Sequence, residues 1–392
     1  MRILHVQHPF VPGLGYQENY LLAKQRRLGH DVLLVTSTVV PPKFQSVVGR
    51  ARYPPGDYEY DGVPTKRLPP LVTLPGIDDL ALRSLARTIE RFDPDVVHAH
   101  GLLSLKTFQT LRYAAGSDAK LFVDVHIDND NFHLDRPYKR AGFWAFRRFV
   151  LPRLVERTDA FLPVNPLSER LLVDDLGVPA DRVALLSLGV DDEVFTPDPD
   201  AGDAFRAELD VGPDDVLVVS AGNLEPTKDL ADLVRAFATV ARDRSDVTLV
   251  LVGDGEASYL DSVRAVVADE GVEERVVFYG AVPHHDLQRV YNAADVGVWP
   301  GKLGITIIEA IGTGLPVVVC DSPATTFLTG RENGLVFDRH DVPALAERLR
   351  QYVDDPALRA RHAAAAARLA TEELSWTRIA ERSIDLYREY GP

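Results

Sequence analysis

One loop and the helix that follows it combine an anion-binding pattern with a carboxylate. A predicted strand ends at Trp299, residues 300–304 form a glycine-containing loop, and a predicted helix then carries Glu309. Backbone N–H groups at a helix start bind anions. A carboxylate about one and a half turns further along suits hydrogen bonds to two ribose hydroxyls. The alternative is that Gly301 and Gly304 only form a tight turn and that Glu309 is a solvated helix residue.

Two places in the first half of the sequence could contact a sugar or a phosphate. His126 stands at the carboxyl end of an apolar predicted strand, where parallel sheets bind their ligands; a histidine packed in the core is the alternative. Gly13 and Gly15 follow the first predicted strand, and a glycine pair lets the backbone approach a ligand closely. His98 and His100 end a further strand and are equally compatible with a site, with packing and with solvation.

The framework for these residues is an alternation of strands and helices. Short apolar runs alternate with amphipathic segments along the chain, which predicts parallel sheets covered by helices on both faces. The alternation pauses in residues 196–213, which are rich in Asp, Pro and Gly and are interpreted as an interdomain linker. We therefore predict an α/β fold with two doubly wound, Rossmann-like domains, residues 1–195 and 214–374, facing each other across a cleft that holds the site.

The charge balance restricts the partners and the environment. The 392 residues include 58 acidic and 43 basic ones, for a formal net charge of −15, and only 8 of the bases are lysines. An acidic surface argues against nucleic acid as a partner. An excess of Asp with few Lys is typical of proteins that work in molar salt, where charge repulsion is screened. We therefore expect a halophilic archaeon as the source; a GC-rich genome is the alternative explanation for the low Lys content.

Other features of the composition exclude several kinds of site. Cys320 is the only cysteine, so neither a disulfide nor a cysteine-based zinc site is expected. The N-terminal residues show no signal-peptide pattern, and no apolar run reaches the roughly 18–20 residues of a membrane span. We therefore expect a cytoplasmic protein that could lie peripherally at the inner face of the cell membrane.

Residues 136–157 reverse the sign of the charge locally. They hold seven basic residues, one acidic residue and five aromatic residues. A basic helix with aromatic side chains suits an anionic membrane surface or a lipid-phosphate acceptor. The candidate membrane contacts are Arg140, Trp144, Arg147 and Arg148. The alternative is an amphipathic helix that packs on the sheet by its aromatic side chains.

The segment around Glu309 resembles the retaining GT-B glycosyltransferases of family GT4, glycosyltransferase group 1. The matches with the family's Glu-x7-Glu segment are Gly304, Glu309, Ala310, Gly314, Pro316 and Val317. Further matches occur in the family's order along nearly the whole chain: Gly29 to Val32, Gly189 to Asp191 with Phe195 and Pro197, Gly222 to Leu224 with Lys228, Gly253 to Gly255, and Ser375 with Trp376.

The resemblance implies transfer of a sugar, with retention at the anomeric carbon, from a nucleotide-sugar donor to a glycan or lipid-linked acceptor. It implies no metal and no other cofactor. The C-terminal domain would bind the donor, the N-terminal domain the acceptor, and residues 375–392 would form helices that cross back to the first domain. Catalytic roles fall on Lys228 at the diphosphate, His126 beside the sugar and Glu309 at the ribose. Gly13 and Gly15 would contact the acceptor or a phosphate. The donor-binding positions are Gly222, Asn223, Lys228, Gly253, Gly280, Val282, Lys302, Gly304, Ile305, Thr306 and Glu309.

Three positions depart from the family pattern. Gly301 stands where the first Glu of the Glu-x7-Glu motif is expected, Asn223 replaces an Arg of the phosphate motif, and Tyr16 replaces the second Gly of the family's N-terminal GGxE loop. We hypothesise that Lys302 restores a cation near the diphosphate. The departures keep two other functions open: a non-catalytic nucleotide-sugar-binding subunit of a glycosyltransferase complex, and a GT-B-fold sugar-nucleotide epimerase.

Overall fold

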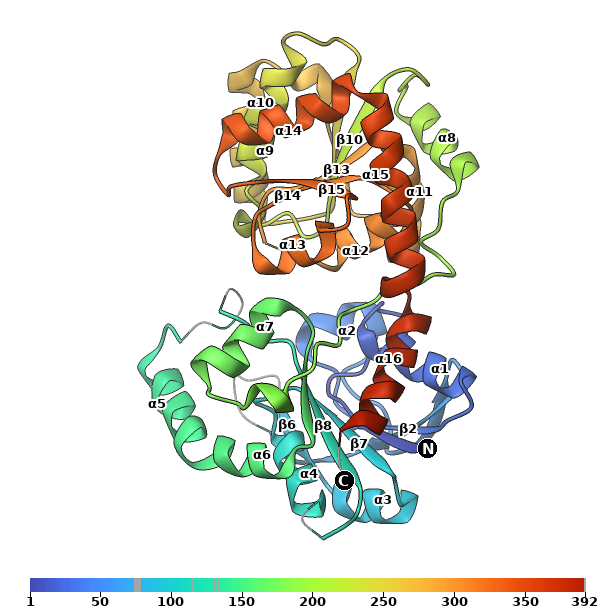
Figure 1. Cartoon of the computed structure of the whole chain (residues 1–392), viewed down its shortest axis with the longest axis vertical. Coiled ribbons are helices and arrows are strands. Elements are labelled where there is room, and N and C mark those ends of the chain that lie inside the picture. Colours follow the sequence, from blue (N-terminus) through green and yellow to red (C-terminus); the bar gives the residue numbers. More distant parts are fainter. Residues whose placement is uncertain (74–78, 115, 130–131, 133, 303, 391–392) are drawn as a thin grey trace. The chain divides into compact units, whose positions relative to one another are not determined.

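The chain forms two compact units (Figure 1). The computed structural model describes residues 1–73, 79–114, 116–129, 132, 134–302 and 304–390. Unit 1 consists of Met1–Ser187 and Ile379–Pro392, and unit 2 consists of Leu188–Arg378. None of the helices in these described residues is long and apolar enough to span a membrane.

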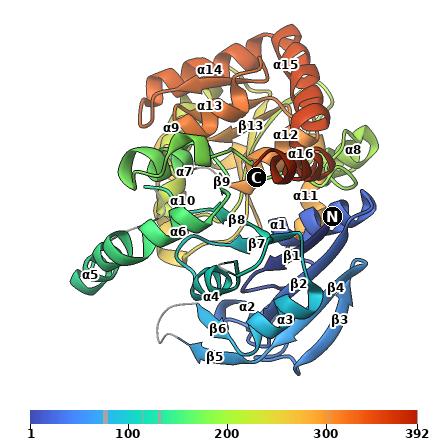
Figure 2. The same ribbon diagram turned by 60° about the horizontal axis from the view of Figure 1, so that its bottom comes forward.

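A mostly parallel sheet lies at the centre of unit 1, and its strands can be followed in Figure 2. In the described residues the strand order is β3-β4-β2-β1-β7-β8-β9, and β3 runs antiparallel to its neighbour β4. This antiparallel edge is not part of the predicted alternation. The strands are β1 (Arg2–Val6), β2 (Asp31–Ser37), β3 (Gly56–Tyr60), β4 (Val63–Leu68), β7 (Val96–His100), β8 (Lys120–Val125) and β9 (Ala160–Pro163), with β5 (Pro70–Thr73) and β6 (Leu80–Leu82) as a separate antiparallel pair.

The two faces of this sheet differ in character. One face is apolar and packs on α3 and α6 through side chains such as Ile89 and Leu154. The other face carries histidines and meets α1 and the C-terminal helix α16, whose Tyr387 ring lies 4.8 Å from the ring of Phe122. The helices are α1 (Gln17–Arg27), α2 (Pro42–Val48), α3 (Leu85–Phe92), α4 (Leu105–Ala114), α5 (Pro137–Ala145), α6 (Leu151–Arg157), α7 (Pro166–Arg170) and α16 (Trp376–Glu389).

A parallel sheet with both faces buried lies at the centre of unit 2. Its strand order in the described residues is β12-β11-β10-β13-β14-β15. Val216 and Val218 face an apolar cluster with α9, α10 and α14, whereas Leu217 and Val219 face a second cluster with α8, α11, α12 and α15. Such alternation is required when helices cover both faces of a sheet. The prediction of two doubly wound, Rossmann-like α/β domains is therefore confirmed.

The elements of unit 2 follow the chain in strict alternation over most of its length. Its strands are β10 (Val216–Ala221), β11 (Val247–Val252), β12 (Val276–Gly280), β13 (Val296–Trp299), β14 (Val317–Cys320) and β15 (Gly334–Phe337). Its helices are α8 (Pro199–Glu208), α9 (Leu230–Ala241), α10 (Ala257–Glu270), α11 (Leu287–Ala293), α12 (Ile305–Gly312), α13 (Pro323–Thr329), α14 (Val342–Asp354) and α15 (Pro356–Leu369).

The stretch predicted as a linker, residues 196–213, instead contains a helix of unit 2. Phe205 of α8 is fully buried in the core shared with α11. The Asp and Pro residues that suggested a linker start this helix: the Asp198 side chain accepts a hydrogen bond from the Ala201 N–H at 3.1 Å, and Pro199 is the first helical residue. The same residue types favour loops and helix starts, which explains the difference.

Candidate functional site

The turns at the carboxyl ends of β10, β11 and β12 are joined by backbone hydrogen bonds. The N–H of Gly222 donates to the carbonyl of Val252 at 3.0 Å, and the N–H of Gly253 donates to the carbonyl of Gly280 at 2.8 Å. A Cβ atom on Gly253 would overlap the carbonyl oxygen of Gly222, so this approach requires glycine. Gly222, Gly253 and Gly280, three predicted donor-binding residues, therefore lie together at the sheet edge where such folds bind ligands.

Lys228 lies beside the start of α12. It ends the 3-10 turn Pro226–Lys228, and its Nζ donates a hydrogen bond to the carbonyl oxygen of Lys302 at 2.9 Å. A Cβ atom on Gly304, the residue before α12, would lie 3.3 Å from this Nζ. Burial lowers the pKa of Lys228, and the charge of Lys302 adds to that effect. An ammonium beside the N–H groups of a helix start can bind an anion such as a diphosphate.

The loop before α12 is held against the Lys228 turn. The N–H of Lys302 donates to the carbonyl of Thr227 at 2.9 Å, and the thiol of Cys320 donates to the carbonyl of Gly301 at 3.2 Å. A Cβ atom on Gly301 would overlap the carbonyl oxygen of Thr227 and lie 2.7 Å from Cα of Lys228. The glutamate of the family motif has no room at position 301 in this backbone. The loss of the motif glutamate at position 301 therefore follows from the close contact between this loop and the Lys228 turn.

The remaining predicted donor-binding residues differ in placement. Thr306, in the first turn of α12, has its Oγ1 3.5 Å from the place of a Cβ atom on Gly222, so α12 reaches the turn after β10. Ile305 and Val282 are half-buried and pack on the apolar core of unit 2. Asn223 is exposed.

Glu309 is buried in α12 and pairs with a histidine that the sequence analysis did not identify. Its Oε1 accepts a hydrogen bond from Nε2 of His284 at 2.7 Å, and 3% of its side chain is exposed. The interpretation of Glu309 as a solvated helix residue is therefore wrong. The hydrogen bond to Glu309 raises the pKa of His284. The available signal for His284 was a histidine pair in the turn after β12, at the ligand-binding edge of the sheet.

Two polar atoms near this pair have no protein partner. Oε2 of Glu309 and the hydroxyl of Tyr291 are buried, and neither makes a hydrogen bond within the described residues. Burial raises the pKa of Tyr291, and the Glu309 charge adds to it. An unsatisfied buried polar atom costs about 1–3 kcal/mol, which a ligand hydroxyl would offset. We call Lys228, Gly304, Glu309 and His284 the α12 site.

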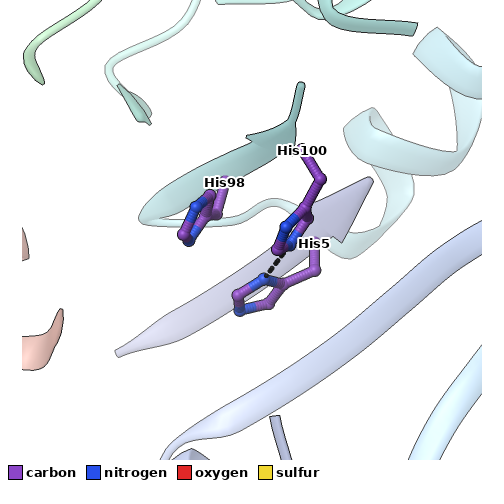
Figure 3. Close-up of side chains that lie close together, drawn as sticks. All are labelled: His5, His98 and His100. Atoms are coloured by element: carbon purple, nitrogen blue, oxygen red, sulfur yellow. Dashed lines mark hydrogen bonds between the residues drawn. The ribbon is translucent and has the colours of Figure 1, made fainter. Parts of the chain in front are cut away.

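Unit 1 holds a buried group of histidines on the strands β1 and β7 (Figure 3). His5 and His98 are partners in the parallel register. The rings of His98 and His100 stack with centroids 4.5 Å apart and 6° between their planes, and Nδ1 of His5 lies 3.0 Å from Nε2 of His100. Of the alternatives for His98 and His100, burial inside the unit is therefore correct.

The hydrogen-bond partners determine where the protons of these histidines lie. Gln25 donates its amide N–H to Ser383 Oγ at 2.9 Å, and its carbonyl oxygen accepts from His5 Nε2 at 2.8 Å. Burial lowers the pKa of His5 well below its usual value, so His5 is neutral, and its Nδ1 accepts from His100 Nε2. His100 Nδ1 donates to Asp124 Oδ2 at 2.5 Å. His100 therefore donates from both ring nitrogens, to His5 and to a buried carboxylate. We call His5, His98, His100 and Asp124 the histidine cluster.

His126 joins the histidine cluster from the end of β8. Its Nε2 lies 3.3 Å from Oδ2 of Asp124. The side chain of His126 is 42% exposed, so it is not packed in the core, and the charge of Asp124 outweighs partial loss of hydration and raises the pKa of His126. Burial alone would raise the pKa of Asp124. The charges of His100 and His126 outweigh burial and hold the pKa of Asp124 well below its usual range. The structure thus gives His126 a carboxylate partner two residues before it in the chain.

The loop with Gly13 and Gly15 precedes α1 in the same unit. Both glycines have a left-handed backbone conformation, with φ of +78° and +71°, which explains why glycine occurs at these positions. The N–H of Gly13 donates to Oδ1 of Asn19 at 3.1 Å. At the start of α1, both amide atoms of Gln17 are buried without a hydrogen-bond partner in the part of the chain that the structure describes. Gln17 is a polar group near this loop that the sequence analysis missed.

The histidine cluster does not have the geometry of a metal centre. Ligand nitrogens of His5, His98 and His100 lie within 4.8 Å of one another. However, the lone pairs of the nearly parallel His98 and His100 rings lie in parallel planes and do not converge. Both nitrogens of His5 and of His100 are also engaged in hydrogen bonds. Nδ1 of His98 lies 2.6 Å from the hydroxyl of Tyr387, and Nε2 of His98 is the one ring nitrogen of the three histidines without a hydrogen-bond partner among the described residues.

Residues 136–157 form α5 and α6 with the π-helical turn Phe146–Val150 between them. Phe146 is buried in the core of unit 1, as the packing alternative expected. Tyr138 and Trp144 are each 63% exposed, which that alternative did not expect. A cavity of about 340 Å³ is lined by Leu134, Arg140, Phe143, Trp144, Arg147 and Arg148. It includes all four predicted membrane-contact residues.

Two families of known proteins match the chain, one in each unit. Residues 203–369 match the family described as Glycosyl transferases group 1, and residues 13–189 match the Glycosyl transferase 4-like domain. The chain therefore carries both domains, and the resemblance inferred from its motifs is confirmed at this level.

Curated relatives share about a third of their aligned residues with the chain. A GDP-mannose-dependent alpha-(1-6)-phosphatidylinositol monomannoside mannosyltransferase of Mycolicibacterium smegmatis is 32% identical over 251 residues, which cover 61% of this chain and 64% of that protein. A D-inositol 3-phosphate glycosyltransferase of Stackebrandtia nassauensis is 32% identical over 252 residues, which cover 61% and 55%. The chain thus spans less than two thirds of these relatives' length.

Solved structures match the whole fold. Anabaena Alr3699/HepE in complex with UDP has a TM-score of 0.75 at 18% identity, over 99% of this chain and 100% of that one. A glycosyltransferase from Rickettsia africae has a TM-score of 0.74 at 15% identity, over 99% and 98%. These likenesses confirm the predicted fold class.

Proposed function

Because the chain carries both glycosyltransferase domains, we propose that it is a retaining glycosyltransferase. It moves a sugar from a nucleotide-sugar donor, bound by unit 2, to a glycan or lipid-linked acceptor. The observation that carries the proposal is the place of the Lys228 ammonium beside the start of α12. The buried Glu309 of α12 supplies a carboxylate oxygen that accepts a hydrogen bond from a ribose hydroxyl.

Lys228 acts on the charge that develops during transfer. When the bond between the anomeric carbon and the phosphate oxygen breaks, the diphosphate gains negative charge. The ammonium and the α12 N–H groups stabilise that charge more in the transition state than in the ground state. Lys302 is the proposed second cation, in place of the Arg that Asn223 replaces. No metal and no other cofactor takes part, so a chelator is expected to leave turnover unchanged.

Unit 1 supplies the acceptor side of the proposed reaction. His126, held by Asp124, contacts the transferred sugar. The backbone of the loop with Gly13 and Gly15 contacts the acceptor or a phosphate, because its glycines leave the backbone accessible.

Turnover of a donor panel tests the proposal. The purified protein, in molar KCl, is given UDP-, GDP-, ADP- and CMP-sugars, and release of the nucleotide is measured. GDP-mannose is the first donor to test, because one of the relatives is named for it. Nucleotide release with a product of retained anomeric configuration supports the proposal. Binding without release supports the non-catalytic subunit, and a changed sugar nucleotide without release supports the epimerase.

The molar salt in this assay follows from the charge balance. We propose that the net charge of −15 is an adaptation to a halophilic archaeal cytoplasm. Unfolding on transfer to low KCl is the expected result, and equal stability at both salt concentrations would contradict it.

Contact with an anionic membrane is the second part of the proposal, and it puts the protein peripherally at the inner face of the cell membrane. The basic cavity beside the exposed Trp144 suits a lipid phosphate and its apolar chain. Vesicles with anionic lipid are expected to pellet the wild type at moderate salt. Replacement of Arg147 and Arg148 by Ala is expected to abolish this. The same change at Arg87 and Arg91, exposed arginines of α3, is the matched control; equal loss in both variants would contradict a specific contact.

A further inference from the structure

His284 connects a buried carboxylate to the surface of unit 2. Its side chain is 34% exposed, whereas that of its partner Glu309 is 3% exposed. The two belong to different elements, the 3-10 turn His284–Asp286 and α12, and are 25 residues apart in the chain. The contact is therefore formed by the fold and not by local sequence.

The contact fixes the hydrogen-bond roles of both groups. Nε2 of His284 donates its N–H to Oε1 of Glu309, with 2.7 Å between the two atoms. The ring of His284 packs edge-on against the buried Phe195, with centroids 5.4 Å apart. Packing on one side and the carboxylate on the other leave the ring little freedom to rotate.

The other carboxylate oxygen is left for a ligand. Oε2 of Glu309 is buried and has no hydrogen-bond partner among the described residues. Glu309 follows Thr306 by one helical turn and therefore shares its side of α12, which meets Gly222 at the end of β10. A ligand group that donates to Oε2 would satisfy the one oxygen that His284 does not reach.

We propose that His284 is a positioning residue for the donor: it holds Glu309 so that Oε2 accepts a hydrogen bond from a ribose hydroxyl. This inference rests on the proposed function, in which unit 2 binds a nucleoside diphosphate. The imidazole also offsets a carboxylate charge that would otherwise repel the diphosphate. His284 itself acts through Glu309 and leaves the bond-breaking step to Lys228.

The test compares ribose with deoxyribose. Calorimetry measures the affinity of UDP and GDP and of their 2′-deoxy and 3′-deoxy forms, in molar KCl. The wild type is expected to prefer the ribonucleotide over at least one deoxy form by about tenfold or more, the effect of one hydrogen bond to a charged group. His284→Ala is expected to lose most of this preference, with weaker ribonucleotide binding and little change for the deoxy form. A donor KM that rises more than kcat falls is the expected kinetic counterpart.

Two further variants separate positioning from folding. His284→Gln keeps an N–H donor and is expected to recover part of the preference. His285→Ala removes the neighbouring histidine, which is 74% exposed and pairs with Asp286, and is expected to behave as the wild type. Full ribose preference in folded His284→Ala would overturn this inference alone. Failure of the wild type to bind either nucleoside diphosphate would overturn the proposed function, and this inference with it.

Discussion

The histidine cluster of unit 1 and the α12 site of unit 2 both bury charged side chains, but they satisfy them differently. In the histidine cluster, both nitrogens of His5 and of His100 are hydrogen-bonded, and only Nε2 of His98 lacks a partner in the part of the chain that the structure describes. In the α12 site, Oε2 of Glu309 has no partner within the described residues. A charged group whose partners lie inside the fold, such as Asp124, recovers its desolvation cost there, whereas the free oxygen of Glu309 recovers it from a ligand. Variants of the first should therefore lose stability, and variants of the second should lose binding.

Removal of the carboxylate in the histidine cluster is the strongest test of this difference. Asp124→Ala removes the buried carboxylate that accepts from His100 Nδ1 and from the Gly101 N–H and that pairs with His126, and we expect a loss of about 3–5 kcal/mol in the free energy of unfolding. Urea unfolding measures it, with the exposed Asp118→Ala as the control in the same unit. If Asp124→Ala cost no more than Asp118→Ala, the hydrogen bonds to Asp124 would not stabilise the fold.

Gly301→Ala tests the backbone of the α12 site. The added Cβ atom meets the backbone of Thr227 and Lys228, so we expect a loss of about 1–3 kcal/mol in stability together with weaker nucleotide binding. Gly304→Ala is the matched control for stability, because its Cβ atom would meet side-chain ends and no backbone: Nζ of Lys228 at 3.3 Å and Oγ1 of Thr306 at 3.6 Å. Equal unfolding free energies for the two variants would contradict the account of the missing motif glutamate.

The pH dependence of stability distinguishes the two regions by sign. Burial lowers the pKa of His98 to about 3. Between pH 6.5 and 3 the unfolded chain therefore binds a proton that the folded chain does not. The free energy of unfolding decreases by about 1.4 kcal/mol for each pH unit by which the pH is lowered. His284 has a raised pKa, so its contribution is complete below pH 6.5 and is lost only as the pH rises through the folded pKa.

Urea unfolding of the wild type and of His98→Gln across this range measures the effect. The variant should have a shallower slope, by one proton, between pH 6.5 and 3. Identical slopes would show that His98 is not held neutral in the folded protein.

Lys302→Ala has the smallest expected effect. The backbone carbonyl of Lys302 accepts the hydrogen bond from Lys228 whatever the side chain at position 302 is. The Lys302 side chain therefore contributes only its charge. We expect donor affinity to fall by about 0.2–1 kcal/mol, more at moderate than at molar KCl. Lys302→Arg keeps the charge and should bind as the wild type. If Lys302→Ala changed neither affinity nor turnover, Lys302 would not be the compensating cation.

The fold could be predicted from the sequence because each strand and helix has its own local pattern. The apolar run Val216–Ala221 predicts a buried strand without knowledge of its neighbours. The helix α8 was missed because Asp198 and Pro199 favour a helix start and a loop alike. The antiparallel edge formed by β3 was missed although its signal is local, because Asp61 and Gly62 join β3 to the next strand as a two-residue hairpin turn.

Candidate site residues could be predicted where a motif or a strand end placed them, as with Lys228 and Glu309. The partners that give them their charge state were harder to predict. His284 reaches Glu309, and His100 reaches Asp124, only after strands and helices have packed. The exclusion of a side chain at Gly301 likewise follows from a backbone contact with Thr227, 74 residues earlier in the chain, which no local pattern contains.

The rate of nucleotide release from the donor by Lys228→Ala tests the central claim most directly, since the claim is that this ammonium acts on the departing diphosphate. The variant is compared with the wild type at saturating donor in molar KCl, after thermal unfolding has shown that both are folded. We predict a fall of about 10²–10³-fold in kcat, as for the loss of one donor to a developing anion. A kcat within threefold of the wild type would contradict the account.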